Sequence, residues 1–201
     1  MRSFYHAKGS EMAESETEET ATIATHVIGT TGDDIIEEGY VDDNGAVLGA
    51  EEGGHDKVNG HEGDDTITTG EGSDLASGDM VGEEWQFIDG KWVYDPALID
   101  TTSDPVTRNF DDIIVTGKGD DVLLGNGGND QLFSGAGDDL VNAGTGKDTV
   151  FGGEGDDTLN LEDGNDYAEG GLGADTINAG DGDDVVYGDV NAESVLSLIH
   201  I

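Results

Sequence analysis

The stretch that decides the fold is Gly152-Gly153-Glu154-Gly155-Asp156-Asp157-Thr158-Leu159-Asn160, a nine-residue unit that repeats along the chain. Its sixth-position aspartate recurs at an unbroken spacing of nine at Asp112, Asp121, Asp130, Asp139, Asp148, Asp157, Asp166, Asp175 and Asp184. A glycine stands two residues before each aspartate from Asp121 onward, and an apolar residue stands two residues after every one. So regular a period predicts a solenoid, in which each unit stacks on its neighbours.

The same pattern extends toward the N-terminus. Three more units carry Asp56, Asp65 and Asp74, and an isolated unit carries Asp34. The spacing of 22 between Asp34 and Asp56 is not a multiple of nine, which predicts an irregular loop at 38–50. The β-branched and apolar run 21–28 predicts an opening strand.

Each unit predicts one short strand and one turn. Three residues such as Thr158-Leu159-Asn160 are expected to be extended, with the middle side chain pointing inward. The six residues before them, with glycines where positive φ is needed, form the turn. Two units then complete a coil of 18 residues, and stacked coils form parallel sheets. The fold predicted is an all-β parallel β-roll, with Phe133, Phe151 and Tyr187 in an apolar strip on its outer surface.

Residues 79–110 interrupt the repeat with an insertion. The run 85–94 holds two β-rich segments around Asp89-Gly90, which predicts a β-hairpin. In that register Phe87 faces Trp92 and Trp85 faces Tyr94, so all four aromatic side chains share one face. Two interpretations are open: a flap that covers the roll with its aromatics buried, or an exposed platform for a glycan or protein partner.

Composition narrows the function classes. The 201-residue chain has 47 acidic and 7 basic residues and a formal charge of -40, which argues against nucleic-acid binding because phosphate contacts need Lys and Arg. No apolar run approaches the length of a membrane span. There is no cysteine and the histidines are not periodic, so Zn²⁺ and Cu²⁺ are disfavoured. No catalytic motif is present, and charge of this size opposes a compact state unless cations bind.

The unit matches the form G-G-x-G-x-D-x-U-x, and the chain resembles the RTX, or hemolysin-type, calcium-binding repeats of secreted bacterial proteins. The resemblance covers 112–190 strongly, 51–78 well and 29–37 weakly. It implies Ca²⁺ held between neighbouring turns by sixth-position aspartates and backbone carbonyls. The implied metal ligands in this sequence are Asp34, Asp56, Asp65, Asp74, Asp112, Asp121, Asp130, Asp139, Asp148, Asp157, Asp166, Asp175 and Asp184.

Calcium chemistry agrees with this implication, because Ca²⁺ prefers six to eight oxygen ligands that mix carboxylates and carbonyls. Alternate units are expected on opposite edges of the roll, with Asp112 and Asp130 on one and Asp121 and Asp139 on the other. The main block then has seven gaps for ions. The units of Asp112 and Asp166, which lack usual glycines, are expected to bind more weakly. Fifth-position residues such as Asp120 and Asp156 are expected to be solvated turn residues.

The predicted organisation has five segments. These are an acidic disordered tail at 1–20, a β-roll segment at 21–78, the insertion at 79–110, the main roll at 111–190 and a tail at 191–201 that resembles a translated sequencing adapter. The resemblance implies an extracellular protein, exported by a type I secretion machinery and folded by calcium after export. Three function classes remain: a calcium scaffold, an adhesive or glycan-binding module that uses Trp85, Phe87, Trp92 and Tyr94, and the repeat region of a larger secreted enzyme or toxin.

Overall fold

The computed structural model describes residues 23–29, 34–37, 48, 55–61, 63, 65–78, 85–89, 91–94, 110–188 and 198–200. All regular elements in these residues are β-strands. The predicted acidic tail at 1–20 lies outside the described residues, as does most of the predicted loop at 38–50. Leu48 of that loop is described, and it is fully buried in the core.

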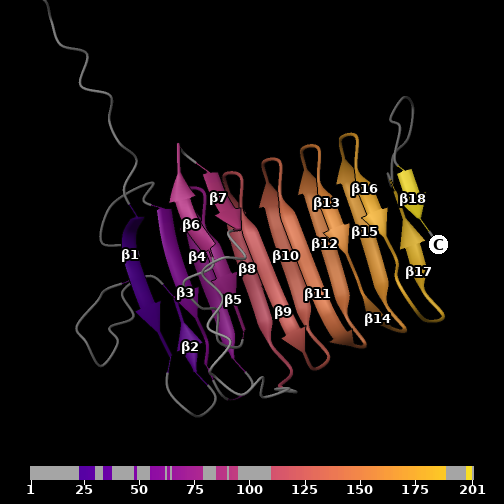
Figure 1. The fold of residues 1–201 in the computed structure, drawn as a ribbon, viewed down its shortest axis with the longest axis horizontal. Helices are drawn as coiled ribbons and strands as arrows, with labels where there is room; N and C mark the ends of the chain where they lie inside the picture. Colours follow the sequence, from indigo (N-terminus) through magenta and orange to yellow (C-terminus); the bar gives the residue numbers. More distant parts are fainter. Residues whose placement is uncertain are drawn as a thin grey trace, which may run out of the picture.

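Two parallel sheets form the body of the molecule, and their strands lie side by side along its long axis (Figure 1). Sheet A contains β1 (Ile23–Ile28), β3 (His55–Asn59), β5 (Leu75–Ser77), β9 (Val122–Gly127), β11 (Leu140–Gly146), β13 (Thr158–Asn160), β16 (Thr176–Asn178) and β18 (Leu198–His200), with β14 (Asp163–Gly164) also paired to β11. Sheet B contains β2 (Ile35–Ile36), β4 (Thr66–Glu71), β8 (Ile113–Lys118), β10 (Gln131–Ala136), β12 (Thr149–Glu154), β15 (Tyr167–Leu172) and β17 (Val185–Tyr187).

The register confirms the predicted coil of 18 residues. In sheet B, Leu132 pairs with Val150, and Val150 pairs with Ala168. In sheet A, Val141 pairs with Leu159. Consecutive units therefore alternate between the sheets, and a strand pairs with the strand two units away. The fold is the parallel β-roll that the repeat predicted.

The interior is filled mainly by apolar side chains from the middle residue of the strands, with Leu48, Ala143, Leu161 and Ala179 packed among them. Ile114, Leu123, Leu132, Val141 and Val150 are completely buried and belong to one cluster. Their neighbours along the strand point outward, as expected for period-two alternation. Each strand contributes about one inward side chain, so the core is thin relative to the surface of the roll. The stability of the fold must therefore also depend on the turns.

Aromatic side chains line the outer face of sheet B, as predicted, and the strip also includes Tyr167, which was not predicted. The rings of Phe133 and Phe151 stack with centroids 5.2 Å apart. Phe151 then contacts Tyr167, and Tyr167 contacts Tyr187, both at 5.8 Å. Tyr167 was missed because it occupies the seventh position of its unit, whereas the other three occupy the ninth.

The insertion contains the predicted hairpin, formed by β6 (Trp85–Ile88) and β7 (Lys91–Tyr94). Its register is the expected one, with Trp85 opposite Tyr94 and Phe87 opposite Trp92. Trp92 is buried against Leu75, Val122 and Leu124 on the outer face of sheet A, and Trp85 and Phe87 pack beside it. This packing favours the flap interpretation of the hairpin.

The insertion does not disturb the coil stacking. β4 pairs directly with β8, with Thr66 opposite Ile113, and β5 pairs with β9, with Leu75 opposite Val122. Near the C-terminus, the backbone of β18 continues sheet A by pairing with β16. The suggestion that residues 191–201 derive from a sequencing adapter stays a prediction. No helix among the described residues is long and apolar enough to cross a membrane.

Candidate metal centre

The sixth-position aspartates form two ladders, one on each edge of the roll. On both edges the backbone N–H of one aspartate donates to Oδ1 of the aspartate one coil later. The Asp121 edge runs Asp56, Asp74, Asp121, Asp139, Asp157 and Asp175, with N···O distances of 2.6–3.2 Å. The Asp112 edge runs Asp34, Asp65, Asp112, Asp130, Asp148, Asp166 and Asp184, with distances of 2.7–2.9 Å. All thirteen predicted residues therefore join these two ladders.

The ladders cross both irregular parts of the sequence. Asp65 pairs with Asp112 and Asp74 with Asp121, each at a separation of 47 residues instead of 18. Asp34 pairs with Asp65 at a separation of 31 residues. The ladders therefore stay in register across both additional segments, and the isolated first unit belongs to the same ladder as the main block.

In the ladder carboxylates of Asp148, Asp157 and Asp166, the second oxygen is buried and lacks compensation. Asp148, Asp157 and Asp166 are at most 2% exposed. In each of them Oδ1 accepts the ladder hydrogen bond, whereas Oδ2 is buried and has no hydrogen-bond partner. A buried carboxylate oxygen without a partner costs free energy unless a proton or a cation compensates it.

The same unfavourable burial of negative charge raises the pKa of the ladder carboxyls. Burial raises the pKa of Asp121 to about 8, of Asp157 to about 7, and of Asp139 and Asp148 to about 6. The ladder hydrogen bonds oppose the rise, and neighbouring carboxylates add to it. These carboxyls therefore take up protons near neutral pH when no metal is bound.

Burial also raises the pKa of Asp74 and Asp166. For Asp74, the ladder hydrogen bond, the Thr69 hydroxyl and His55 each lower the pKa and so partly offset the effect of burial. The effect is therefore present on both edges.

The first-position glycines bring backbone carbonyls close to the ladders, because a Cβ at Gly152 would collide with both Oδ2 of Asp157 and the carbonyl oxygen of Gly170. Gly155, at the fourth position of its unit, has a φ of 130°, and a Cβ there would collide with the carbonyl oxygen of Gly137 one coil earlier. The same packing recurs at Gly137 against Gly119. Glycine is needed here because the φ is positive and because the coils approach so closely.

The donor set fits calcium. Among the described residues there is no group of three or more His, Cys, Asp or Glu side chains that could hold a metal. An ion between coils would accordingly depend on ladder carboxylates together with turn carbonyls. Oxygen-only coordination that mixes carboxylate and carbonyl suits Ca²⁺, and the unpartnered Oδ2 atoms of Asp148, Asp157 and Asp166 supply buried negative charge for it.

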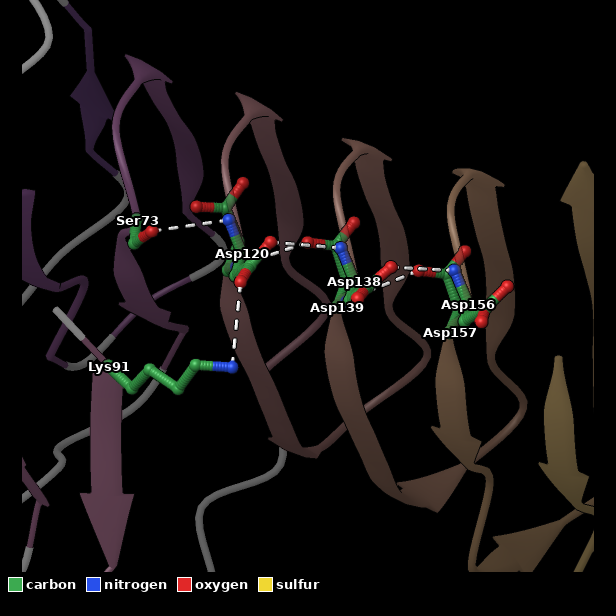
Figure 2. Close-up of polar contacts among 8 residues, drawn as sticks. Ser73, Lys91, Asp120, Asp138, Asp139, Asp156 and Asp157 are labelled. Carbon is green, nitrogen blue, oxygen red and sulfur yellow. Dashed lines mark hydrogen bonds and ion pairs between the residues drawn. The ribbon is translucent and has the colours of Figure 1, made fainter. Parts of the chain in front are cut away.

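A second, outer ladder was missed by the sequence analysis. The fifth-position side chains are exposed, as predicted, but several accept a hydrogen bond from the next coil (Figure 2). Asp138 N–H donates to Asp120, Asp156 N–H donates to Asp138, and Ala174 N–H donates to Asp156. On the Asp112 edge the acceptors are Asp111, Asn129 and Asn165. The recurrence of Asp or Asn at a spacing of 18 was the signal available in the sequence.

Buried hydroxyls at the first position of the unit were also missed. The Thr116 hydroxyl donates to the Ser134 carbonyl at 2.8 Å, and the Ser134 hydroxyl donates to the Gly152 carbonyl at 2.8 Å. Both residues are fully buried, and both lie on the Asp121 edge. Their hydroxyls lower the pKa of Asp121 and Asp139 against the larger effect of burial. The sequence signal for these hydroxyls was the recurrence of a Thr or Ser at the first position of units 18 residues apart.

Replaced glycines do not break the backbone path. Glu162 stands where the repeat usually has glycine, yet its φ is 69°, and Asn126 and His61 take positive φ at the equivalent position. The turn of Asp166 keeps its shape at the expense of a conformation that non-glycine residues disfavour. The expectation of weaker ion binding beside Asp112 and Asp166 stays a prediction.

The fold and the two carboxylate ladders define a class of protein, the parallel β-roll built on glycine-rich, aspartate-bearing turns. The family model for the RTX calcium-binding nonapeptide repeat matches four times, over residues 52–79, 107–141, 133–168 and 162–191. The chain belongs to this family. No curated protein and no solved structure gave a significant match.

Proposed function

We propose that the chain is a calcium-stabilised scaffold whose two aspartate ladders bind ions between successive coils. The observation that carries this proposal is the buried Oδ2 of Asp148, Asp157 and Asp166, which has no hydrogen-bond partner although Oδ1 of the same carboxylate accepts the ladder hydrogen bond. Membership in a calcium-binding repeat family supports Ca²⁺ as the ion. The thirteen ladder aspartates are the proposed carboxylate ligands, and turn carbonyls complete the coordination.

The free energy of ion binding is large enough to control folding. At about 1 mM Ca²⁺ and a Kd of about 0.1 mM, one site stabilises the folded state by about 1.4 kcal/mol. Seven such sites in the main block give roughly 10 kcal/mol, which equals the total stability of a typical domain. The thin apolar core does not offset chain entropy on this scale. We therefore propose that the roll unfolds at cytosolic calcium and folds at extracellular calcium.

This calcium dependence supports an extracellular location. A chain that stays unfolded at low calcium suits export in an unfolded state, and a type I secretion machinery is the proposed exporter. The hairpin is proposed to act as a flap, because Trp92 is 8% exposed and packs on sheet A. The described repeats act as a binding and structural unit and not as a catalyst.

Far-UV circular dichroism of the full chain tests the proposal. A β-sheet signal is expected at 1 mM CaCl₂, and its loss is expected when a chelator removes the calcium. Mg²⁺ at the same concentration is the matched control and should not restore the signal, because Mg²⁺ gives up its waters reluctantly. An unchanged β-sheet signal in chelator would contradict the proposal, as would equal recovery in Mg²⁺.

A further inference from the structure

The turn at Ser73 is hydrogen-bonded both to Trp92 of the hairpin and to His55 of β3. Ser73 N–H donates to Nδ1 of His55 at 2.7 Å, and the Ser73 carbonyl accepts from Nε1–H of Trp92 at 2.9 Å. Its hydroxyl accepts from the backbone N–H of Asp120 at 3.2 Å, which links this turn to the next coil (Figure 2). All three polar groups of one turn residue are therefore engaged.

Further contacts attach the hairpin to the same place. The ring of Phe87 lies 4.5 Å from the ring of His55, the residue that accepts from Ser73. Nζ of Lys91 lies 3.8 Å from Oδ2 of Asp120, in an exposed pair that contributes little by itself. Trp92 supplies the central contact, since its indole is both buried on sheet A and hydrogen-bonded to the turn.

Turns in the main block have fewer supports of this kind. The equivalent residues Asp138 and Asp156 are exposed, and the hydrogen bonds found at them run along the ladder to neighbouring coils. Ser73 immediately precedes Asp74, whose carboxylate accepts from Asp56 and whose N–H donates to Asp121. The hairpin therefore braces one side of the gap between Asp74 and Asp121.

We propose that Trp92, Ser73 and His55 are positioning residues that pre-form the calcium site between Asp74 and Asp121, so that this site fills first and the hairpin docks with it. A braced turn loses less conformational entropy when it binds an ion, so its affinity is higher than that of an unbraced turn. By linkage, an ion at this site stabilises the docked hairpin by the same factor. The inference rests on the proposed calcium function and assigns the insertion a part in it.

Each single-tryptophan variant isolates one reporter, since the chain has two tryptophans. In Trp85→Phe, the remaining emission comes from Trp92. Calcium is titrated into this variant while Trp92 emission and far-UV ellipticity are recorded on the same sample. The blue shift of Trp92 is expected at a calcium concentration at least about threefold below the midpoint of the ellipticity change. Coincident midpoints, or a later response of Trp92, would overturn the inference.

Trp92→Phe tests the indole hydrogen bond, because it keeps an aromatic ring and removes the donor to Ser73. The loss of one hydrogen bond predicts a rise of about fivefold in the calcium midpoint reported by Trp85. The matched control is Trp85→Phe, which packs on the same hairpin and should leave the ellipticity midpoint within about twofold of the parent. A Trp92→Phe midpoint, read from Trp85 emission, that equals the midpoint read from Trp92 emission in Trp85→Phe would refute the role of Trp92.

Ser73→Ala provides a second variant, since it removes only the hydroxyl that accepts from Asp120. It is expected to shift the early step toward higher calcium while leaving the final ellipticity at 1 mM Ca²⁺ unchanged; no shift of the early step would count against the inference. The two proposals fail differently. If calcium adds no β-sheet signal to the parent chain, the proposed function fails; if calcium folds the chain but Trp92 does not respond first, only this inference fails.

Discussion

The two edges of the roll share one backbone geometry but differ in the residues that surround their ladders. On the Asp121 edge, Asp120, Asp138 and Asp156 place a second carboxylate beside Asp121, Asp139 and Asp157, whereas Ser73 and Ala174 precede Asp74 and Asp175. On the Asp112 edge, positions 129, 147 and 165 hold Asn, Lys and Asn, and aspartate is found only at the outer positions 111 and 183 of the main block. Between residues 120 and 166 the Asp121 edge is therefore the more negative one, and the pKa of Asp121 and Asp157 is raised further than that of Asp148.

The backbone shows the opposite asymmetry. On the Asp121 edge, the second position of the unit is glycine with positive φ throughout Gly70, Gly117, Gly135, Gly153 and Gly171. On the Asp112 edge, Gly144 and Gly180 take this conformation, but so do the non-glycine residues His61, Asn126 and Glu162. The Asp121 edge thus carries electrostatic cost that a cation relieves, whereas three turns of the Asp112 edge carry conformational cost that a cation does not remove. The comparison predicts that the two edges respond differently to pH and to replacement of a second-position residue by glycine.

Acidification is expected to have the largest effect, because it acts on several rungs of both ladders at once. In the metal-free fold the pKa of Asp121 is about 8 and that of Asp157 about 7, both above the ordinary 3.8. Carboxyls with raised pKa stabilise the metal-free fold below pH 3.8, and this contribution is lost as the pH rises through 6–8. Acid therefore favours a protonated metal-free roll from which calcium must displace protons, so the calcium midpoint should rise about tenfold or more between pH 7.5 and 5.5.

Calorimetry in buffers of different ionisation enthalpy measures this proton release. Release should be greatest near pH 6–7 and should vanish at pH 9, where the carboxyls are already ionised. Variants that remove rungs of the Asp121 edge should reduce the release more than variants of the Asp112 edge. The titration is run at pH values where far-UV circular dichroism shows β-sheet without calcium, and calcium binding to that folded chain without proton release would contradict the raised pKa values.

Gly155→Ala is expected to destabilise the calcium-loaded roll by at least about 2 kcal/mol, because it combines an unfavourable positive φ with a collision against the Gly137 carbonyl. Gly146→Ala, on the Asp112 edge, meets the Gly128 carbonyl in the same way and should cost as much. Gly70→Ala is the control, since its φ is also positive but a Cβ there has open space, and about 1 kcal/mol is expected. Thermal unfolding in calcium measures all three, and equal losses would show that close packing of coils is unimportant.

Asp139→Asn and Asp148→Asn compare single rungs of the two edges. The amide keeps an acceptor for the ladder hydrogen bond but removes the charge, so each variant should lose about 1–3 kcal/mol of stability in calcium. In chelator the sign should reverse, because a buried charge has been removed, so each variant should keep at least as much residual β-sheet signal as the parent. Chemical denaturation in calcium and far-UV circular dichroism in chelator check the two signs. A variant that lost stability in calcium and β-sheet signal in chelator alike would indicate a purely structural aspartate.

Glu162→Gly should have the smallest effect and the opposite sign. It relieves a φ of 69° in a non-glycine residue, which predicts a gain of about 1 kcal/mol, and it removes a charge that raises the pKa of Asp148. Asn126→Gly is the matched comparison and should gain less, since Asn tolerates positive φ better. A loss of stability in Glu162→Gly would show that this side chain has a role beyond its backbone conformation.

Local periodicity was enough to predict most of the roll. The spacing of nine predicted the inward residues, the two ladders and the coil of 18, and the structure confirms each through the buried core and the register. The hairpin register also followed from sequence, because a two-residue turn fixes which residues face each other. The outer ladder and the Thr116–Ser134 hydroxyl row were missed because their spacing of 18 becomes meaningful only once alternate units are placed on opposite edges.

What the sequence determined by itself was the roll, since every unit carries its own turn glycines, inward side chain and ladder aspartate, and nearest-neighbour stacking needs nothing more. Only the tertiary structure decided where the irregular parts go. Asp34 joins the ladder through Asp65 across a gap of 31 residues, and Trp92 reaches the carbonyl of Ser73. No local pattern encodes these contacts, because both exist only after distant coils have stacked: the first depends on β2 pairing with β4 in sheet B, and the second on the outer face of sheet A.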